Sequence, residues 1–186
     1  AYNRCSLLKG SLWLLLLDKW DGILYQRDGV FPNYDFSGSV LEIGCGRRGW
    51  FSLMVKSYSD GFVVTTDVFP DKVREAKNIA TSLNLESEGY VVADAAHLPF
   101  RHRAFQKIIG NAVLHHVLPA ISLVAKEIHR VMESRGTAIF TAVIVSSRFL
   151  GWLWKRISLE KMPGEGIATL AAWREPFLDA GFACVS

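Results

Sequence analysis

The chain has 186 residues, of which 50% are hydrophobic and 21% charged, with a formal net charge of +3. This composition suits one globular domain and excludes a disordered or collagen-like chain, and the mild basic excess does not by itself indicate a nucleic-acid partner. The three cysteines lie far apart and indicate neither a disulfide framework nor a zinc ribbon. Reduced thiols in a cytoplasmic protein are the simplest interpretation.

The first 38 residues are rich in leucine and tryptophan. Their longest apolar run, residues 12–17, is far shorter than the roughly 20 residues that cross a bilayer. No small-residue cleavage site follows that run, which argues against a signal peptide. We therefore predict that residues 1–38 form an N-terminal helical cap, and we expect the chain, which starts at Ala1, to be a piece of a longer protein.

From residue 39 onward, short β-prone runs alternate with segments of helical periodicity. The predicted strands are residues 40–43, 62–66, 90–93, 107–109, 137–145 and 182–185. The predicted helices are residues 50–58, 70–83, 120–133 and 175–180. This alternation predicts one α/β domain over residues 1–186, with a mostly parallel sheet and helices on both faces. Within it we expect a core at 39–145, an insert or lid at 146–166, and a last helix and strand at 167–186.

A glycine-rich loop, Gly44 to Gly49, directly follows the first of these strands and opens a helix. Glycines there permit a tight turn, and the helix N-terminus offers free N–H groups to an anion. The next strand ends in Asp67, 23 residues after Gly44, where a carboxylate can accept both hydroxyls of a ribose. Asp67 as a helix N-cap is the alternative, but Asp71 already fills that place. The pattern predicts a nucleoside cofactor, either a nicotinamide dinucleotide or S-adenosylmethionine.

Three further polar positions favour S-adenosylmethionine. Glu42 lies inside a strand expected to be apolar on both faces, where an acid is costly unless paired, and a cationic sulfonium amino acid would pair it. Asp94 and Ala95 end the third strand, where a carboxylate can accept the exocyclic amine of adenine and the next N–H can reach a ring nitrogen. Asn111 ends the fourth strand. Three consecutive strand ends with such groups are stronger evidence than any one.

Five stretches carry a resemblance to a known family. They are VLEIGCG at 40–46, VVTTDV at 63–68, VVADAAHLPF at 91–100, IIGNAVLHHV at 108–117 and EIHRVMESRGTAIF at 127–140. These stretches resemble the class I S-adenosylmethionine-dependent methyltransferases, especially the small "type 11" subgroup. The resemblance implies a Rossmann-like sheet whose seventh strand is antiparallel to the others. Because this chain ends before that strand, we predict that the seventh strand is missing.

The resemblance also implies S-adenosyl-L-methionine as the cofactor. The residues it places there are Glu42, Gly44, Cys45, Gly46 and Asn111 at the methionine part, Asp67 at the ribose, and Val68, Asp94 and Ala95 at adenine. One departure from the family is that Arg47 and Arg48 displace the third glycine of the loop by one residue. An arginine there can bind the cofactor carboxylate. The alternative is that both arginines are solvated.

The candidate catalytic residues are His115 and His116. A base is needed only where the methyl acceptor must lose a proton, and an imidazole titrates near neutral pH. On a helical turn the two side chains would point about 100° apart, so we expect at most one to face the site. The alternative is that one packs and one is solvated. No metal site is predicted, because the histidines and cysteines lack ligand spacing.

Residues 147–157 are basic, aromatic and amphipathic. They suit a lid over an apolar acceptor or contact with an anionic membrane surface, and ordinary packing is the alternative. The sequence thus predicts a cytoplasmic methyltransferase, with possible membrane contact, acting on a small hydrophobic or aromatic acceptor. The alternatives are a non-catalytic scaffold of the same fold and an NAD-dependent oxidoreductase. Nucleic acid is not an expected partner.

Overall fold

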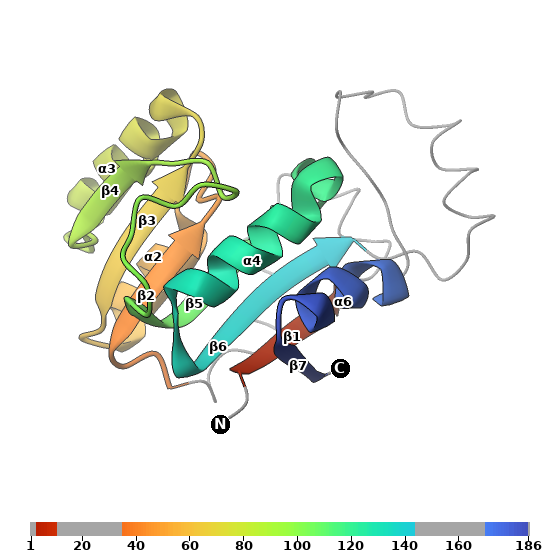
Figure 1. The fold of residues 1–186 in the computed structure, drawn as a ribbon. Coiled ribbons are helices and arrows are strands. Elements are labelled where there is room, and N and C mark those ends of the chain that lie inside the picture. The colour runs from red at the N-terminus through yellow and green to blue at the C-terminus, as the bar shows by residue number, and fades with distance from the viewer. Residues whose placement is uncertain (1–2, 11–34, 144–169, 186) are drawn as a thin grey trace.

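The structure, a computed structural model, describes residues 3–10, 35–143 and 170–185. The seven strands in these residues form one sheet in the order β4-β3-β2-β5-β6-β1-β7, and every pairing is parallel (Figure 1). They are β1 (Asn3–Gly10), β2 (Ser39–Ile43), β3 (Phe62–Asp67), β4 (Gly89–Val92), β5 (Phe105–Asn111), β6 (Met132–Val143) and β7 (Phe182–Val185). The predicted α/β class with a mostly parallel sheet is confirmed.

Helices cover both faces of this sheet. They are α2 (Trp50–Tyr58), α3 (Pro70–Leu83), α4 (Ile121–Val131) and α6 (Leu170–Asp179), with two short 3-10 turns, η2 (Leu114–His116) and η3 (Leu118–Ala120). In Figure 1, α4 and α6 lie in front of the sheet and α2 lies behind it. Helix α6 begins five residues before the predicted start, because Trp173 joins Phe177 in the buried core.

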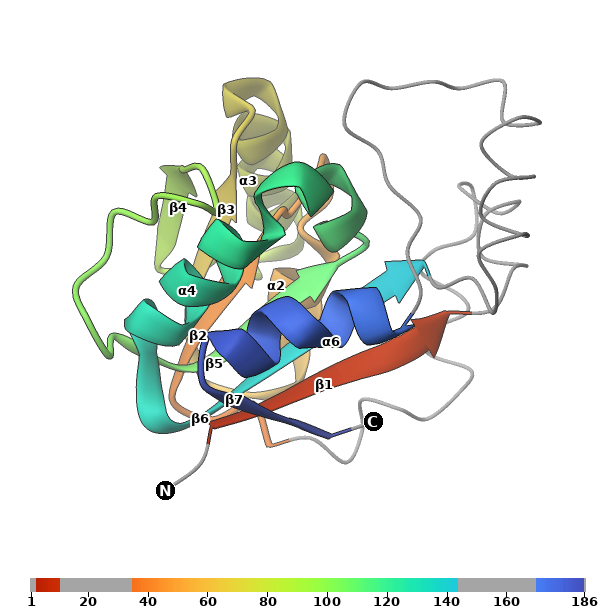
Figure 2. The same ribbon diagram turned by 45° about the vertical axis from the view of Figure 1, so that its right-hand side comes forward.

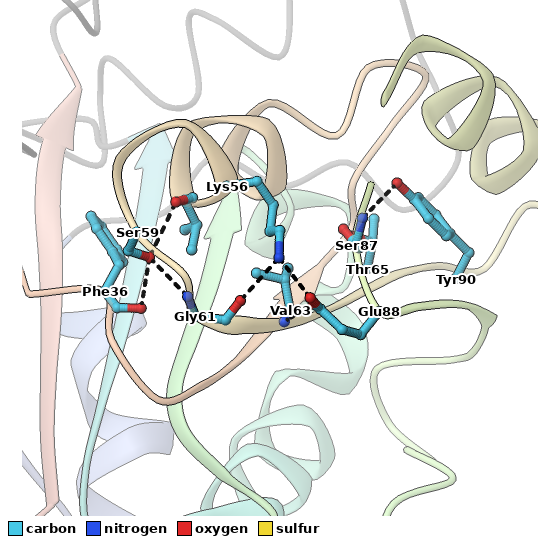
Figure 3. A network of polar contacts seen from close by, with 10 residues as sticks. Phe36, Lys56, Ser59, Gly61, Val63, Thr65, Ser87, Glu88 and Tyr90 are labelled. Carbon is cyan, nitrogen blue, oxygen red and sulfur yellow. Dashed lines mark hydrogen bonds and ion pairs between the residues drawn. The ribbon is translucent and has the colours of Figure 1, made fainter. Parts of the chain in front are cut away.

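The core consists of two layers because successive strand side chains point to opposite faces. Leu41 and Ile108 pack under α4 and α6, whereas their neighbours Val40 and Ile109 pack against α2. Strands apolar on both sides are typical of a parallel sheet covered by helices. On the α2 side, Lys56 pairs with Glu88 at 2.6 Å (Figure 3) and fastens the end of that helix to the start of β4.

The N-terminal segment differs from the sequence prediction. Residues 3–10, predicted as part of a helical cap, form β1 between β6 and β7, with Arg4 opposite Thr137 and Asn3 opposite Phe182. A short apolar run fits a buried strand as well as a helix, and periodicity alone does not separate them. Residues 35–38 of the predicted cap are loop. Residues 11–34 and the predicted insert at 146–166 lie outside the described residues.

The predicted absence concerns a seventh strand that is antiparallel to the others. In the described part of the chain there is no antiparallel pairing, and β7 is the last strand. The sheet nevertheless has seven strands, because β1 supplies one. Because all strands are parallel, their carboxyl ends share one edge of the sheet, from which the loops after β2, β3, β4 and β5 start. Figure 2 shows the arrowheads of β1 and β6 pointing to the same side.

Candidate cofactor site

The loop after β2 takes a conformation that needs its glycines. Gly44, Gly46 and Gly49 have φ angles of +70°, +58° and +59°. A Cβ at Gly44 would lie 2.4 Å from Cγ2 of Val113, whereas one at Gly46 would meet nothing within 4 Å. Open space beside Gly46 therefore leaves the loop backbone accessible to a ligand. Cys45 is buried, and burial, followed by the nearby carboxylates, raises the pKa of its thiol, so it packs as a neutral group.

Two alanine substitutions distinguish the cost of a steric clash from the cost of backbone strain in this loop. Gly46→Ala should lower the free energy of unfolding by about 1–2 kcal/mol, because an L-residue is strained in the left-handed region. Gly44→Ala should lower it by more, because the new Cβ also collides with Val113. Urea unfolding of the two variants measures the difference. Equal losses would contradict the close approach of Val113 to the loop.

Asp67 braces the loop from the end of β3. The side chain is 6% exposed. Its Oδ2 accepts the Gly46 N–H at 2.9 Å and its Oδ1 accepts the Phe69 N–H at 3.0 Å. The N-cap of α3 is Phe69, so Asp67 is not the helix cap of the alternative interpretation. The expectation that Asp71 caps the helix is also wrong, because Asp71 lies within its first turn. Because a carboxylate oxygen has two lone pairs, each oxygen can still accept a ribose hydroxyl.

Glu42 is paired within the protein, contrary to the expectation that a cationic ligand must pair it. Its side chain is 1% exposed. Oε1 accepts the Phe51 N–H at 3.1 Å, and Oε2 accepts the Ser52 N–H at 3.2 Å and the Ser52 hydroxyl. These amides belong to the first turn of α2, which favours a negative group. Burial raises the pKa of Glu42 to about 7, and the charge of Asp67 acts in the same direction.

A chain of hydroxyls runs outward from Glu42. Ser52 Oγ lies 2.5 Å from Thr65 Oγ1, which in turn lies 2.7 Å from Ser87 Oγ. The Tyr90 hydroxyl accepts the Ser87 N–H at 3.1 Å, and Figure 3 shows this outer end. The chain ties β2, α2, β3 and the loop before β4 together. Helix α2 is therefore held at the position where its N-terminus meets the glycine loop.

At the end of β4 lie the residues expected at adenine. Oδ1 of Asp94 accepts the Ala96 N–H at 2.9 Å, and its Oδ2 lies 3.2 Å from His97 Nδ1. The Ala96 bond and then the His97 bond hold the pKa of Asp94 below its usual range, so the group is an ionised acceptor. Ala95 is buried, whereas Val68, after β3, is 54% exposed. Val68 and Asp94 follow the ends of the paired strands β3 and β4, and an apolar side chain with a carboxylate at the same edge suits a purine ring.

Asn111 is held by a residue that the sequence analysis missed. Thr141 of β6 donates its hydroxyl hydrogen to Asn111 Oδ1 at 2.6 Å and accepts the Ala112 N–H at 2.9 Å. Ala112 has a φ of +49°. In sequence, Thr141 is one more β-prone residue of a strand. Only the register, which places it opposite Asn111, indicates its role.

The two candidate catalytic histidines do not diverge as predicted. Their ring centroids lie 4.0 Å apart on the 3-10 turn η2, so the predicted separation of about 100° is wrong. His115 is half-buried, and its Nδ1 is buried with no hydrogen-bond partner. Burial, and then the charge of His116, lowers the pKa of His115 to about 4, so it is neutral at pH 7. His116 is exposed.

Both arginines of the loop have partners within the protein. Arg47 pairs with Glu75 and lies 3.8 Å from Asp71, both on α3. The Arg48 guanidinium lies 5.8 Å from the Trp50 ring centroid. Arg47 is exposed, as the solvated alternative expected, but it also links the loop to α3. Binding of a cofactor carboxylate by Arg47 would require these ion pairs to be exchanged.

The part of the chain that the structure describes contains neither a candidate metal cluster nor a candidate membrane-spanning helix. No group of three or more His, Cys, Asp or Glu side chains there is arranged to hold a metal ion. Nor does any helix there have both the length and the apolar composition needed to cross a membrane.

The methyltransferase domain family matches residues 41–140, which is more than half of the chain. The chain belongs to the class I S-adenosylmethionine-dependent methyltransferase family. The match runs from β2 into β6, so it includes each strand end described above. Membership makes S-adenosylmethionine the cofactor of the domain.

Two curated relatives and one solved structure are similar to this methyltransferase domain. The fatty-acid O-methyltransferase of Mycolicibacterium smegmatis is 26% identical over 102 residues, covering 55% of this chain and 36% of the relative. The aklanonic acid methyltransferase DauC of a Streptomyces strain is 29% identical over 106 residues, covering 56% and 48%. The chain thus matches less than half the length of either relative. The YcgJ protein of Bacillus subtilis shares the fold, with a TM-score of 0.69 and 20% identity over 80% of this chain and 63% of that one.

Proposed function

We propose that the protein is an S-adenosylmethionine-dependent methyltransferase whose acceptor is a small apolar acid. The main support for this cofactor is the hydrogen bond from the Gly46 N–H to the Asp67 carboxylate. This bond holds a buried carboxylate against a glycine loop that has open space beside it. This is the arrangement that a ribose next to an extended amino-acid chain requires.

The residues of the sheet edge fit the three parts of the cofactor. Asp67 retains lone pairs for the ribose hydroxyls, and the backbone at Gly46 is accessible to the methionine part. The exposed Val68 and the carboxylate of Asp94, which follow the ends of two paired strands, suit adenine. When bound, the cofactor supplies a methyl group on a positively charged sulfur. The protein's contribution is then to hold the acceptor atom in line with that methyl group, for which no covalent enzyme intermediate is needed.

Support for an apolar acceptor comes from the tryptophan-rich sequences that continue from the ends of β1 and β6. Gly10 pairs with Val143 at the same edge of the sheet as Asn111 and Thr141. The sequences that continue from these two ends, residues 11–34 and 144–169, contain four of the six tryptophans: Trp13, Trp20, Trp152 and Trp154. Both curated relatives carry the names of acids, one of them a fatty acid.

The state of His115 supports an acid in particular. With a pKa of about 4, His115 is too weak a base to deprotonate an alcohol or phenol at neutral pH. A carboxylate needs no base, because it is ionised already. An acid acceptor therefore requires proton transfer from neither His115 nor His116.

The test compares acceptors that share an apolar chain and differ only in the head group. The chain is incubated with S-adenosylmethionine and a fatty acid, the matching primary alcohol or the matching amide, and S-adenosylhomocysteine release is measured. We expect release with the acid and none with the amide. Release with the alcohol alone would overturn the acid assignment. Cofactor binding without turnover on any acceptor would favour the scaffold alternative, and NAD binding in its place would favour the oxidoreductase.

A further inference from the structure

The loop between β4 and β5, which carries Asp94, is held against the end of α4 by backbone hydrogen bonds at Arg103 and Ala104 and by an ion pair within that helix. Glu127 and Arg130 lie three residues apart on that helix, and their side chains are 21% and 24% exposed. Nε of Arg130 donates to Oε1 of Glu127 and Nη2 donates to Oε2, both at 2.7 Å. Two parallel bonds of this kind fix the guanidinium plane.

The same two side chains hold three backbone groups of the loop. Arg130 donates from Nη1 to the Phe100 carbonyl at 2.7 Å and from Nη2 to the Leu98 carbonyl at 2.8 Å. Oε2 of Glu127 accepts the Leu98 N–H at 2.9 Å. Figure 2 shows the loop passing beside the end of α4 where this pair lies. Leu98 is thus held through both its N–H and its carbonyl.

Leu98 is joined to Asp94 by a tight turn. The His97 N–H donates to the Asp94 carbonyl at 2.9 Å, while the Asp94 side chain accepts the Ala96 N–H and contacts His97. Leu98 and Ala96 are buried, so the turn has little room to shift on its own. A displacement of Leu98 would therefore move the Asp94 carboxylate.

We infer that Glu127 and Arg130 are positioning residues that make the site selective for adenine over a 6-oxo purine, by holding the Asp94 carboxylate where it accepts the 6-amino group. The inference rests on the proposed function, because it takes Asp94 as the adenine contact. A carboxylate accepts a bond from an amino group but faces the lone pairs of a 6-oxo group. The selectivity therefore depends on the carboxylate keeping its place.

The experiment measures that selectivity directly. S-adenosylhomocysteine and its inosine analogue, in which the 6-amino group is replaced by oxygen, are titrated calorimetrically into the wild type, Arg130→Gln and Arg130→Lys. We expect the wild type to prefer the adenosine ligand by at least about tenfold. Arg130→Gln should reduce this preference to about threefold or less, mainly by weakening adenosine binding. Arg130→Lys should lie between, because an ammonium keeps the charge but not the planar fork.

The matched control is Arg135→Gln, which changes an exposed arginine of β6. It should keep the wild-type preference.

Glu127→Gln is the second variant if Arg130→Gln fails to fold, and it should also lower the preference because a neutral amide holds Arg130 less firmly. Equal weakening of both ligands, or an unchanged ratio, would overturn the inference while leaving the proposed function intact. Failure of the wild type to bind S-adenosylhomocysteine would overturn both.

Discussion

Replacing Glu42 by glutamine should change how stability depends on pH. Burial raises the pKa of Glu42 to about 7 in the folded protein, from an ordinary value of 4.5. The folded state therefore favours the protonated acid. The stability that protonation contributes is fully present below pH 4.5 and is lost as the pH rises through about 7. The shift corresponds to about 3 kcal/mol between these limits.

Glutamine has no such titration, so the variant should gain stability relative to the wild type by about 3 kcal/mol between pH 4.5 and pH 8.5. Its absolute stability should still be lower at acid pH, because the amide keeps one oxygen acceptor and its NH₂ group meets the N–H group of either Phe51 or Ser52. Urea unfolding at a series of pH values gives the difference curve. Glu86→Gln, at an exposed acid, is the control and should run parallel to the wild type.

The difference curve is needed because His115 acts in the opposite direction. Its pKa is lowered to about 4, so the neutral form is favoured on folding. The stability this contributes is present above pH 6.5 and is lost as the pH falls through about 4. In the wild-type profile these two effects oppose each other between about pH 4 and pH 7, whereas the difference curve isolates that of Glu42. A difference curve for Glu42→Gln that is flat across this range would show that the carboxyl keeps an ordinary pKa in the folded protein.

Local patterns were sufficient to predict the frame of this site. The alternation of strands and helices, and the polar residues at three consecutive strand ends, are read within short windows of sequence. For that reason Asp67, Asp94 and Asn111 are predictable candidates: in the structure Asp67 and Asn111 are the last residues of β3 and β5, and Asp94 lies two residues after β4, all at one edge of the sheet. The parallel order of the sheet follows from the same alternation, since each crossover returns the chain in the same direction.

Partners that meet only through tertiary packing were not predictable. Glu42 was expected to need a cationic ligand, because nothing in its strand indicates that the first turn of α2 would supply two amides and a hydroxyl. Thr141 and Arg130 are separated by about 30 residues from the groups they hold. Residues 3–10 join the sheet through β6 and β7, far along the chain, so their strand identity has no local signature.

The largest effect on binding is expected for Asp67→Ala. The substitution removes the acceptor of both the Gly46 and the Phe69 N–H groups, so the glycine loop loses its brace to β3. It also removes the group proposed to accept the ribose hydroxyls. Hydrogen bonds to a charged group contribute about 1.5–3 kcal/mol each. Loss of the two proposed bonds to the ribose hydroxyls should therefore weaken S-adenosylhomocysteine binding by about 100-fold or more. Calorimetric titration of the purified variant measures this.

Asp71→Ala is the matched control, because Asp71 is an acid four residues further on whose ion-pair partner, Arg47, is exposed and lies 3.8 Å away. Such a surface pair contributes little, so the affinity of this variant should stay within about twofold of the wild type. Asp67→Asn adds a second comparison: its amide oxygen can replace one of the two carboxylate acceptors, so its affinity should fall between the other two. If Asp71→Ala weakened binding as much as Asp67→Ala, the negative charge of the α3 side would matter and not the brace. The ordering of the three variants therefore separates a specific contact at Asp67 from a general field at this edge of the sheet.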